Sequence, residues 1–140
     1  MDEARVTLSG RLTRDPELQF LNTGKAVVKV SVAVERKWKD NAGEEVKKVS
    51  FFDVVQYGQP AEHVAASLKK GYGIIVTGRL EQRSWETEDG SKRSVIEVLA
   101  DEIAPSLRFV TADIQGIERG EKSGTASRTP LAVDFDENPF

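Results

Sequence analysis

Four valines recur at every second position within residues 26–37, and this pattern restricts the fold more than any other feature of the sequence. An extended chain places every second side chain on the same face. Lys29, Ser31 and Glu35 point to one face. The other face holds Val28, Val30, Val32 and Val34. β-branched side chains at this period suit a pleated sheet far better than a helix, so 26–37 is predicted to be a strand.

Other segments show the same strand pattern, separated by turn residues. In the first of them, Val6, Leu8 and Leu12 share one face. The predicted strands are 5–12, 46–57, 73–85 and 93–103, with a further short strand around 107–112. Turns are expected at 15–16, 39–43 and 88–91, so 26–37 and 46–57 should form a long hairpin.

One segment changes to a helical period. Pro60 suits a first helical position, and the apolar residues after it fall at i, i+3, i+4 and i+7. These are Ala61, Val64, Ala65 and Leu68. Lys69 and Lys70 are expected in the last turn, where the helix dipole favours cations, and Gly71 should end the helix. Strands interrupted by a single helix predict an all-β barrel, which also removes exposed strand edges.

The charge divides the chain into a neutral part and an acidic part. Residues 1–112 carry 17 Lys and Arg against 17 Asp and Glu, whereas residues 113–140 carry 3 against 6. The net charge of −3 therefore arises from the last fifth of the chain. Residues 116–129 are rich in Gly, Ser, Thr and charge and cannot bury enough apolar surface to fold. We expect a folded domain over 1–112, a flexible linker over 113–130 and an acidic terminal segment over 131–140.

The residue inventory leaves little basis for catalysis. The chain has no cysteine and a single histidine, which excludes disulfides, Cys-ligated zinc and a thiol nucleophile. His63 falls on the polar side of the predicted helix, where a solvated side chain is expected. No apolar run approaches the ~18 residues of a membrane span, and no signal-peptide pattern is present. We predict a cytoplasmic binding protein without metal, cofactor or enzymatic activity.

Two tryptophans lie beside cations at the ends of predicted strands. Trp38 occurs within Arg36-Lys37-Trp38-Lys39, and Trp85 follows Arg83 on the strand face opposite the apolar one. Outward aromatic rings next to cations suit single-stranded nucleic acid, because bases stack on the rings and cations neutralise phosphates. Phe51 and Tyr57 share one face of their strand. Phe52 points the other way and is assigned to the core or to a subunit interface.

Several sequence blocks together resemble the bacterial single-stranded-DNA-binding protein family. They are VTLSGRLTRDPEL, FFDVVQYGQPAEHVA and KKGYGIIVTGRLEQRSWETEDG, which fall in the family's order within residues 4–103. The terminal DENPF resembles the family's acidic C-terminal tip. Residues 105–112 resemble the extra strand with which actinobacterial members clamp neighbouring subunits.

The resemblance implies a five-stranded OB-fold barrel that assembles as a homotetramer and binds single-stranded DNA without sequence preference. It implies roles in replication, recombination and repair, whose partner proteins dock on the tip. The DNA-binding residues are expected to be Trp38, Phe51, Tyr57, Trp85, Lys37, Lys39, Lys69, Lys70 and Arg83. The partner-binding residues are expected to be Asp134, Phe135, Asp136, Glu137, Asn138, Pro139 and Phe140.

Some residues depart from the family pattern, and two alternatives stay open. Gln59-Pro60 stands where a Lys-Leu pair is common, and Phe51 replaces a frequent tryptophan. A neutral folded part is unusual for a nucleic-acid binder. The chain could therefore be an OB-fold interaction subunit that has largely lost DNA binding. An enzyme such as a nuclease is the third possibility, against which stands the lack of a metal-ligand cluster.

Overall fold

The computed structural model describes residues 1–116, of which Met1–Val110 form one compact unit. The predicted tip over 131–140 and most of the predicted linker lie outside the described residues. Along the chain the strands are β1 (Arg5–Leu12), β2 (Glu17–Phe20), β3 (Ala26–Lys39), β4 (Glu45–Tyr57), β5 (Gly73–Glu86) and β6 (Lys92–Pro105). The helix α1 (Gln59–Ser67) lies between β4 and β5.

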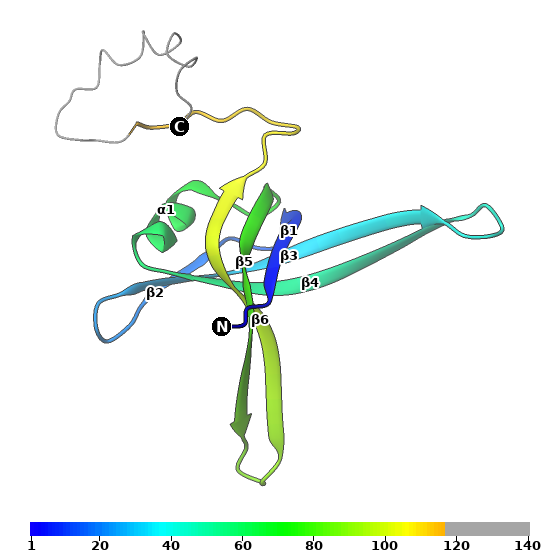
Figure 1. Cartoon of the computed structure of the whole chain (residues 1–140). Coiled ribbons are helices and arrows are strands. Elements are labelled where there is room, and N and C mark those ends of the chain that lie inside the picture. The colour runs from blue at the N-terminus through cyan, green and yellow to red at the C-terminus, as the bar shows by residue number, and fades with distance from the viewer. Residues whose placement is uncertain (117–140) are drawn as a thin grey trace. The chain divides into compact units, whose positions relative to one another are not determined.

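Five of the strands close into a ring. The hydrogen-bonded order is β1-β5-β6-β4-β3-β2, and β1 also pairs with β3 through Arg11 and Leu12, which lie opposite Ala33 and Val32. The ring therefore runs β1-β5-β6-β4-β3 and returns to β1, with β2 added to β3 outside it (Figure 1). This arrangement confirms the predicted all-β barrel with one helix.

The alternating valines form the centre of the barrel. Val28, Val30 and Val32 are almost completely buried, and Val34 packs against the core from its margin. Ala61, Val64 and Leu68 bring α1 onto the same cluster. The full core comprises Leu8, Leu12, Ala26, Val28, Val30, Val32, Val54, Ala61, Val64, Leu68, Ile74, Val76, Val98 and Ala100. The apolar face predicted for the first three valines is therefore the core face.

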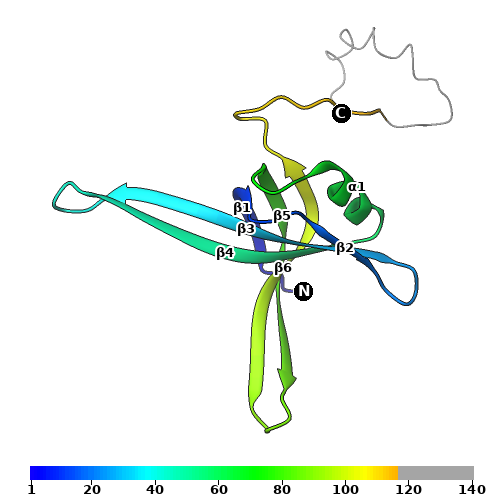
Figure 2. The same ribbon diagram turned by 180° about the vertical axis from the view of Figure 1, so that it is seen from behind.

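Two hairpins extend beyond the barrel as two-stranded arms. The β3–β4 arm comprises residues 35–49 and the β5–β6 arm comprises residues 79–99, and both project away from the helix-capped core (Figures 1 and 2). At the base of the β5–β6 arm, Val98 still belongs to the core. Ile74 and Val76 of β5 are fully buried, whereas Leu80 on the same face is 39% exposed because it lies in the arm. The alternation of apolar and polar side chains thus continues into the arm, where no core covers the apolar face.

Some predicted boundaries were wrong. The chain leaves the helix at Leu68, whose extended backbone conformation carries its side chain into the core. Lys69 and Lys70 therefore lie beyond α1, and the dipole argument does not apply to them. Residues 107–112 form no strand. The short strand β2 was not predicted: it alternates polar and apolar residues, but over only four positions, all of them exposed, and it pairs with β3.

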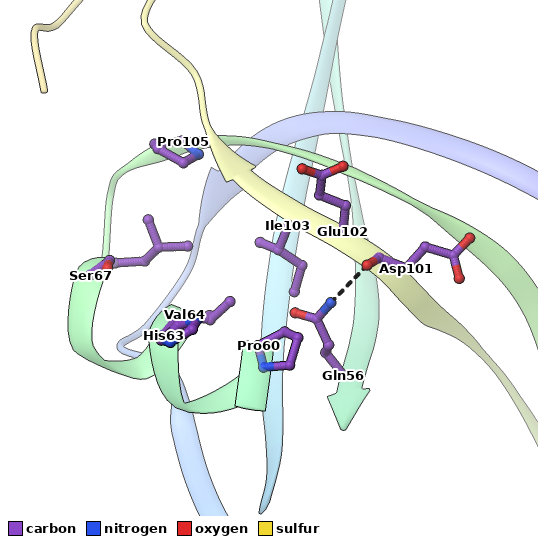
Figure 3. A pocket seen from close by; sticks show the side chains of 10 residues that line it. Gln56, Pro60, His63, Val64, Ser67, Asp101, Glu102, Ile103 and Pro105 are labelled. Carbon is purple, nitrogen blue, oxygen red and sulfur yellow. Dashed lines mark hydrogen bonds between the residues drawn. The ribbon is translucent and has the colours of Figure 1, made fainter. Parts of the chain in front are cut away.

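A β-bulge in β6 brings two backbones unusually close. Thr77 pairs with Glu102 and Gly78 pairs with Ala100, so Asp101 is the extra residue. The carbonyl of Asp101 accepts a hydrogen bond of 3.0 Å from Nε2 of the buried Gln56 (Figure 3). A Cβ at Gly78 would collide with the carbonyl oxygen of Leu99. Only glycine fits at this crossing.

Replacing Gly78 by alanine should therefore destabilise the barrel. Overpacking in a tight core typically costs about 1–3 kcal/mol, and here the obstacle is backbone, which cannot rotate away. Urea unfolding of Gly78→Ala should show a lower midpoint with an unchanged slope. Gly116→Ala is the matched control, because a Cβ there meets nothing within 4 Å. Equal stability of the two variants would contradict the close-crossing interpretation.

Candidate nucleic-acid interface

Trp38 lies in the β3–β4 arm with a cation over its ring. The strand period places Arg36 on the same face, and its guanidinium carbon lies 5.0 Å from the indole centroid. Trp38 is 39% exposed. Val46 lies directly opposite it on β4 and supports the ring from the neighbouring strand. One side of the indole thus contacts a cation, as in a cation–π pair.

Trp85 repeats this arrangement in the β5–β6 arm. The guanidinium carbon of Arg83 lies 5.5 Å from the ring centroid, and the tryptophan is 46% exposed. A hollow of about 410 Å³ opens beside the ring. It is lined by Gln82, Ser84, Trp85, Glu86, Lys92, Arg93 and Ser94. The same Arg-x-Trp spacing therefore presents an indole with a guanidinium on both arms.

Phe51 and Tyr57 share one face of β4, as the strand period predicts. Phe51 lies opposite Ala33 and is 66% exposed, and Tyr57 lies opposite Val27 and is 42% exposed. The ammonium of Lys25 lies 5.4 Å from the Tyr57 ring centroid. Since directly opposed residues share a face, these two rings belong to the opposite face of the hairpin from Trp38. The four aromatic residues thus line two hairpins and do not gather in one pocket.

Phe52 points away from Phe51 and is 36% exposed. Its partner across the sheet is the buried Val32, so it lies where the core face reaches the barrel margin. Assignment to the core of this chain was therefore wrong, whereas an interface role stays a prediction.

The predicted lysines are exposed and occupy two different places. Lys37 and Lys39 share the strand face of Phe51, and Lys37 lies opposite Lys47. Lys69 and Lys70 lie in the loop after α1, which is held against β1 by backbone hydrogen bonds of Gly71 and Tyr72 with Leu12. The Lys70 N–H also donates to the carboxylate of Asp15, which follows β1, at 2.9 Å. Within residues 1–116 none of these four lysines forms an ion pair.

Two cations that contact aromatic rings were absent from the predicted set. Arg36, rather than Lys37 or Lys39, covers Trp38, and Lys25 covers Tyr57. The spacing could have identified Arg36, because Arg36 precedes Trp38 by two positions as Arg83 precedes Trp85. Lys25 could not be found in this way, because it meets Tyr57 only through the pairing of β3 with β4.

Carboxylates neutralise part of the positive charge on both arms. Glu35 accepts from Lys47 at 3.0 Å, and this hydrogen bond lowers the pKa of Glu35. Glu97 lies 3.6 Å from Arg83. At the end of the β5–β6 arm, hydrogen bonds from Thr87 and Ser91 lower the pKa of Asp89 to about 2, so this carboxylate stays ionised at a lower pH than an ordinary aspartate. The interface therefore offers fewer free cations than its lysine and arginine content implies.

A second hollow lies beside α1 and contains none of the predicted DNA-binding residues. It has a volume of about 350 Å³ between the helix and the end of β6, with the exposed His63 at its rim and Gln56 at its inner end (Figure 3). In the described part of the chain, no cluster of three or more His, Asp or Glu side chains is placed to hold a metal ion. No helix in that part is long and apolar enough to span a membrane.

Known proteins share both the sequence and the fold. A single-stranded DNA-binding protein of Corynebacterium glutamicum is 45% identical over 129 residues, which cover 86% of this chain and 55% of that protein. The corresponding protein of Mycobacterium leprae is 44% identical over 119 residues, covering 84% of this chain and 71% of the relative. The chain thus spans little more than half the length of the Corynebacterium relative.

A solved structure supports the same assignment. The Plasmodium falciparum SSB complex with ssDNA superimposes with a TM-score of 0.69 at 25% identity, over 76% of this chain and 97% of that one. The sequence model of the Single-strand binding protein family matches residues 3–106, which include both arms and the whole barrel. The resemblance stated from the sequence is therefore confirmed, and the chain belongs to the single-strand binding protein family.

Proposed function

We propose that this protein binds single-stranded DNA by stacking bases on aromatic rings of its β3–β4 and β5–β6 hairpins, with lysines and arginines contacting the phosphates. The observation that carries the proposal is the repeated pairing of an exposed indole with an arginine guanidinium, at Trp38 and at Trp85. A guanidinium on one side of the ring leaves the other side for a base. Each base stacked on an aromatic ring contributes about 1–3 kcal/mol.

Stacking explains why binding should not depend on sequence. Every base has a π-face, and neither arm combines a buried polar site with a fixed donor pattern that could select one base. Trp38, Phe51, Tyr57 and Trp85 are the proposed stacking residues. The proposed phosphate contacts are Lys37, Lys39, Lys69, Lys70 and Arg83, which are all exposed. This is a binding function and requires no catalytic group.

The complete assembly is proposed to be a homotetramer in the cytoplasm, associated with the nucleoid. Exposed apolar residues on the described unit, among them Phe52, Ile75 and Ile96, support association with further copies. The C-terminal tip is proposed to recruit proteins of replication, recombination and repair. Phe140 with its α-carboxylate would enter an apolar pocket with a basic rim, while the acidic residues at 134, 136 and 137 accelerate the encounter.

One observation favours a second candidate, an interaction subunit with little DNA affinity. Residues 1–112 have no net charge, and several of their cations are engaged by carboxylates. Such a subunit would act through its tip alone.

Intrinsic tryptophan fluorescence distinguishes the two candidates, because both tryptophans lie in the proposed interface. Titration with oligo-dT should quench the fluorescence saturably, with a modest salt dependence, and duplex DNA should not. No quenching by either nucleic acid would favour the interaction subunit.

Removing either indole should weaken DNA binding. Trp38→Ala and Trp85→Ala should each cost about 1–3 kcal/mol of binding free energy, as expected for the loss of one stacked base. Fluorescence anisotropy of a labelled oligo-dT measures the affinity without depending on the tryptophans. Phe20→Ala is the matched control, because Phe20 is an exposed aromatic residue on β2, outside both arms. Unchanged affinity in both tryptophan variants would refute the stacking assignment.

Deleting Phe140 should separate partner binding from DNA binding. The loss of the terminal ring and the displacement of the carboxylate should abolish binding to a replication or repair protein of the same cell, measured by calorimetry. The affinity for oligo-dT should stay nearly unchanged, because the proposed stacking residues all lie within residues 1–112. A marked loss of DNA affinity would show that the role assigned to the tip is wrong.

A further inference from the structure

Four charged side chains form a neutral network along one face of the β5–β6 arm. Arg79 contacts Glu81 through two nitrogen atoms, Nη2 at 3.1 Å and Nε at 3.2 Å. Arg83 contacts Glu97 across the hairpin at 3.6 Å. We call Arg79, Glu81, Arg83 and Glu97 the arm ladder. It leads directly to Trp85, whose ring contacts Arg83.

The geometry of the arm ladder is costly unless both arginines are present. Glu81 and Glu97 lie directly opposite each other on β5 and β6, and like charges in this position repel. Each carboxylate is balanced by one arginine, so the two adjacent glutamates lie between two arginines. Glu97 is the least exposed member, with 24% of its side chain accessible. The carboxylates therefore engage both arginines of the proposed DNA-binding arm while no DNA is bound.

Single-stranded and duplex DNA respond differently to such neutralisation. Non-specific duplex binding depends almost entirely on contacts between cations and phosphates. Single strands also offer unpaired bases, and stacking on an aromatic ring does not need a net positive surface. A protein with exposed tryptophans and engaged arginines should therefore keep its affinity for single strands and lose affinity for duplexes.

We propose that Glu81 and Glu97 are specificity-determining residues that discriminate against duplex DNA by competing with phosphates for Arg79 and Arg83. The inference rests on the proposed single-strand-binding function and deepens it. The β3–β4 arm has a comparable contact, in which Glu35 holds Lys47 at 3.0 Å. The two glutamates would thus act by weakening the complex with duplex DNA, rather than by strengthening the complex with single-stranded DNA.

Neutralising the two carboxylates tests the proposal. In the full-length Glu81→Gln/Glu97→Gln variant both arginines become free for phosphates, while the side chains keep their shape. Affinity for a labelled duplex should rise about tenfold at low salt, and its log–log salt slope should steepen by about 0.9 for each cation freed. Affinity for oligo-dT of equal length should rise only about threefold. The ratio of single-strand to duplex affinity should therefore fall.

Glu62→Gln/Glu102→Gln is the matched control, because it also removes two negative charges, on α1 and at the barrel end of β6, away from both arms. A ratio that stays constant or rises in the Glu81→Gln/Glu97→Gln variant would overturn the proposal, as would an equal fall in the Glu62→Gln/Glu102→Gln control. Thermal unfolding verifies that the variant is folded. If the double variant does not fold, Glu97→Gln alone is measured against the same criteria. Failure of the wild-type protein to bind oligo-dT would instead refute the proposed function, and the inference with it.

Discussion

The architecture depends on β1 pairing with two strands at once. Along most of its length β1 pairs with β5, and at its end Arg11 and Leu12 pair with β3. This double pairing turns an open sheet into a ring and surrounds the valine core. It also requires close backbone approach, because a Cβ at Gly10 would collide with the carbonyl oxygen of Ala33. Closing the ring therefore buries the core and at the same time requires glycine at position 10.

The arms depend on the closed barrel. β3, β4, β5 and β6 each begin or end in the barrel, where the core holds their register. Beyond the barrel the same alternation of faces continues, but no opposing layer covers the apolar side. Side chains on this apolar side are therefore exposed on a two-stranded ribbon. Trp38 illustrates this, since it lies on the continuation of the face that carries the buried valines.

Charge is distributed so that the interface is polar without being strongly basic. Equal numbers of acidic and basic residues occur in residues 1–112, and on the arms several of them are paired with each other. A surface of this kind attracts polyanions only weakly at long range. In the proposed function, stacking on the aromatic rings therefore supplies much of the contact energy. This balance is consistent with a family whose members bind single-stranded DNA.

The sequence alone determined five of the six strands, their buried faces and the exposure of Trp85, because local alternation records which side of a strand meets the core. Trp38 lies on the face of the buried valines, and its flanking cations, rather than alternation, indicated its exposure. It also indicated one short helix, but the helix ends before Lys69 because burial of Leu68 extends the backbone there. The bulge at Asp101 and the contact of Lys25 with Tyr57 were decided only by the tertiary structure. Each arises from pairing between strands, for which a single sequence carries no local signal, whereas the missed strand β2 is short and pairs with the next strand along the chain.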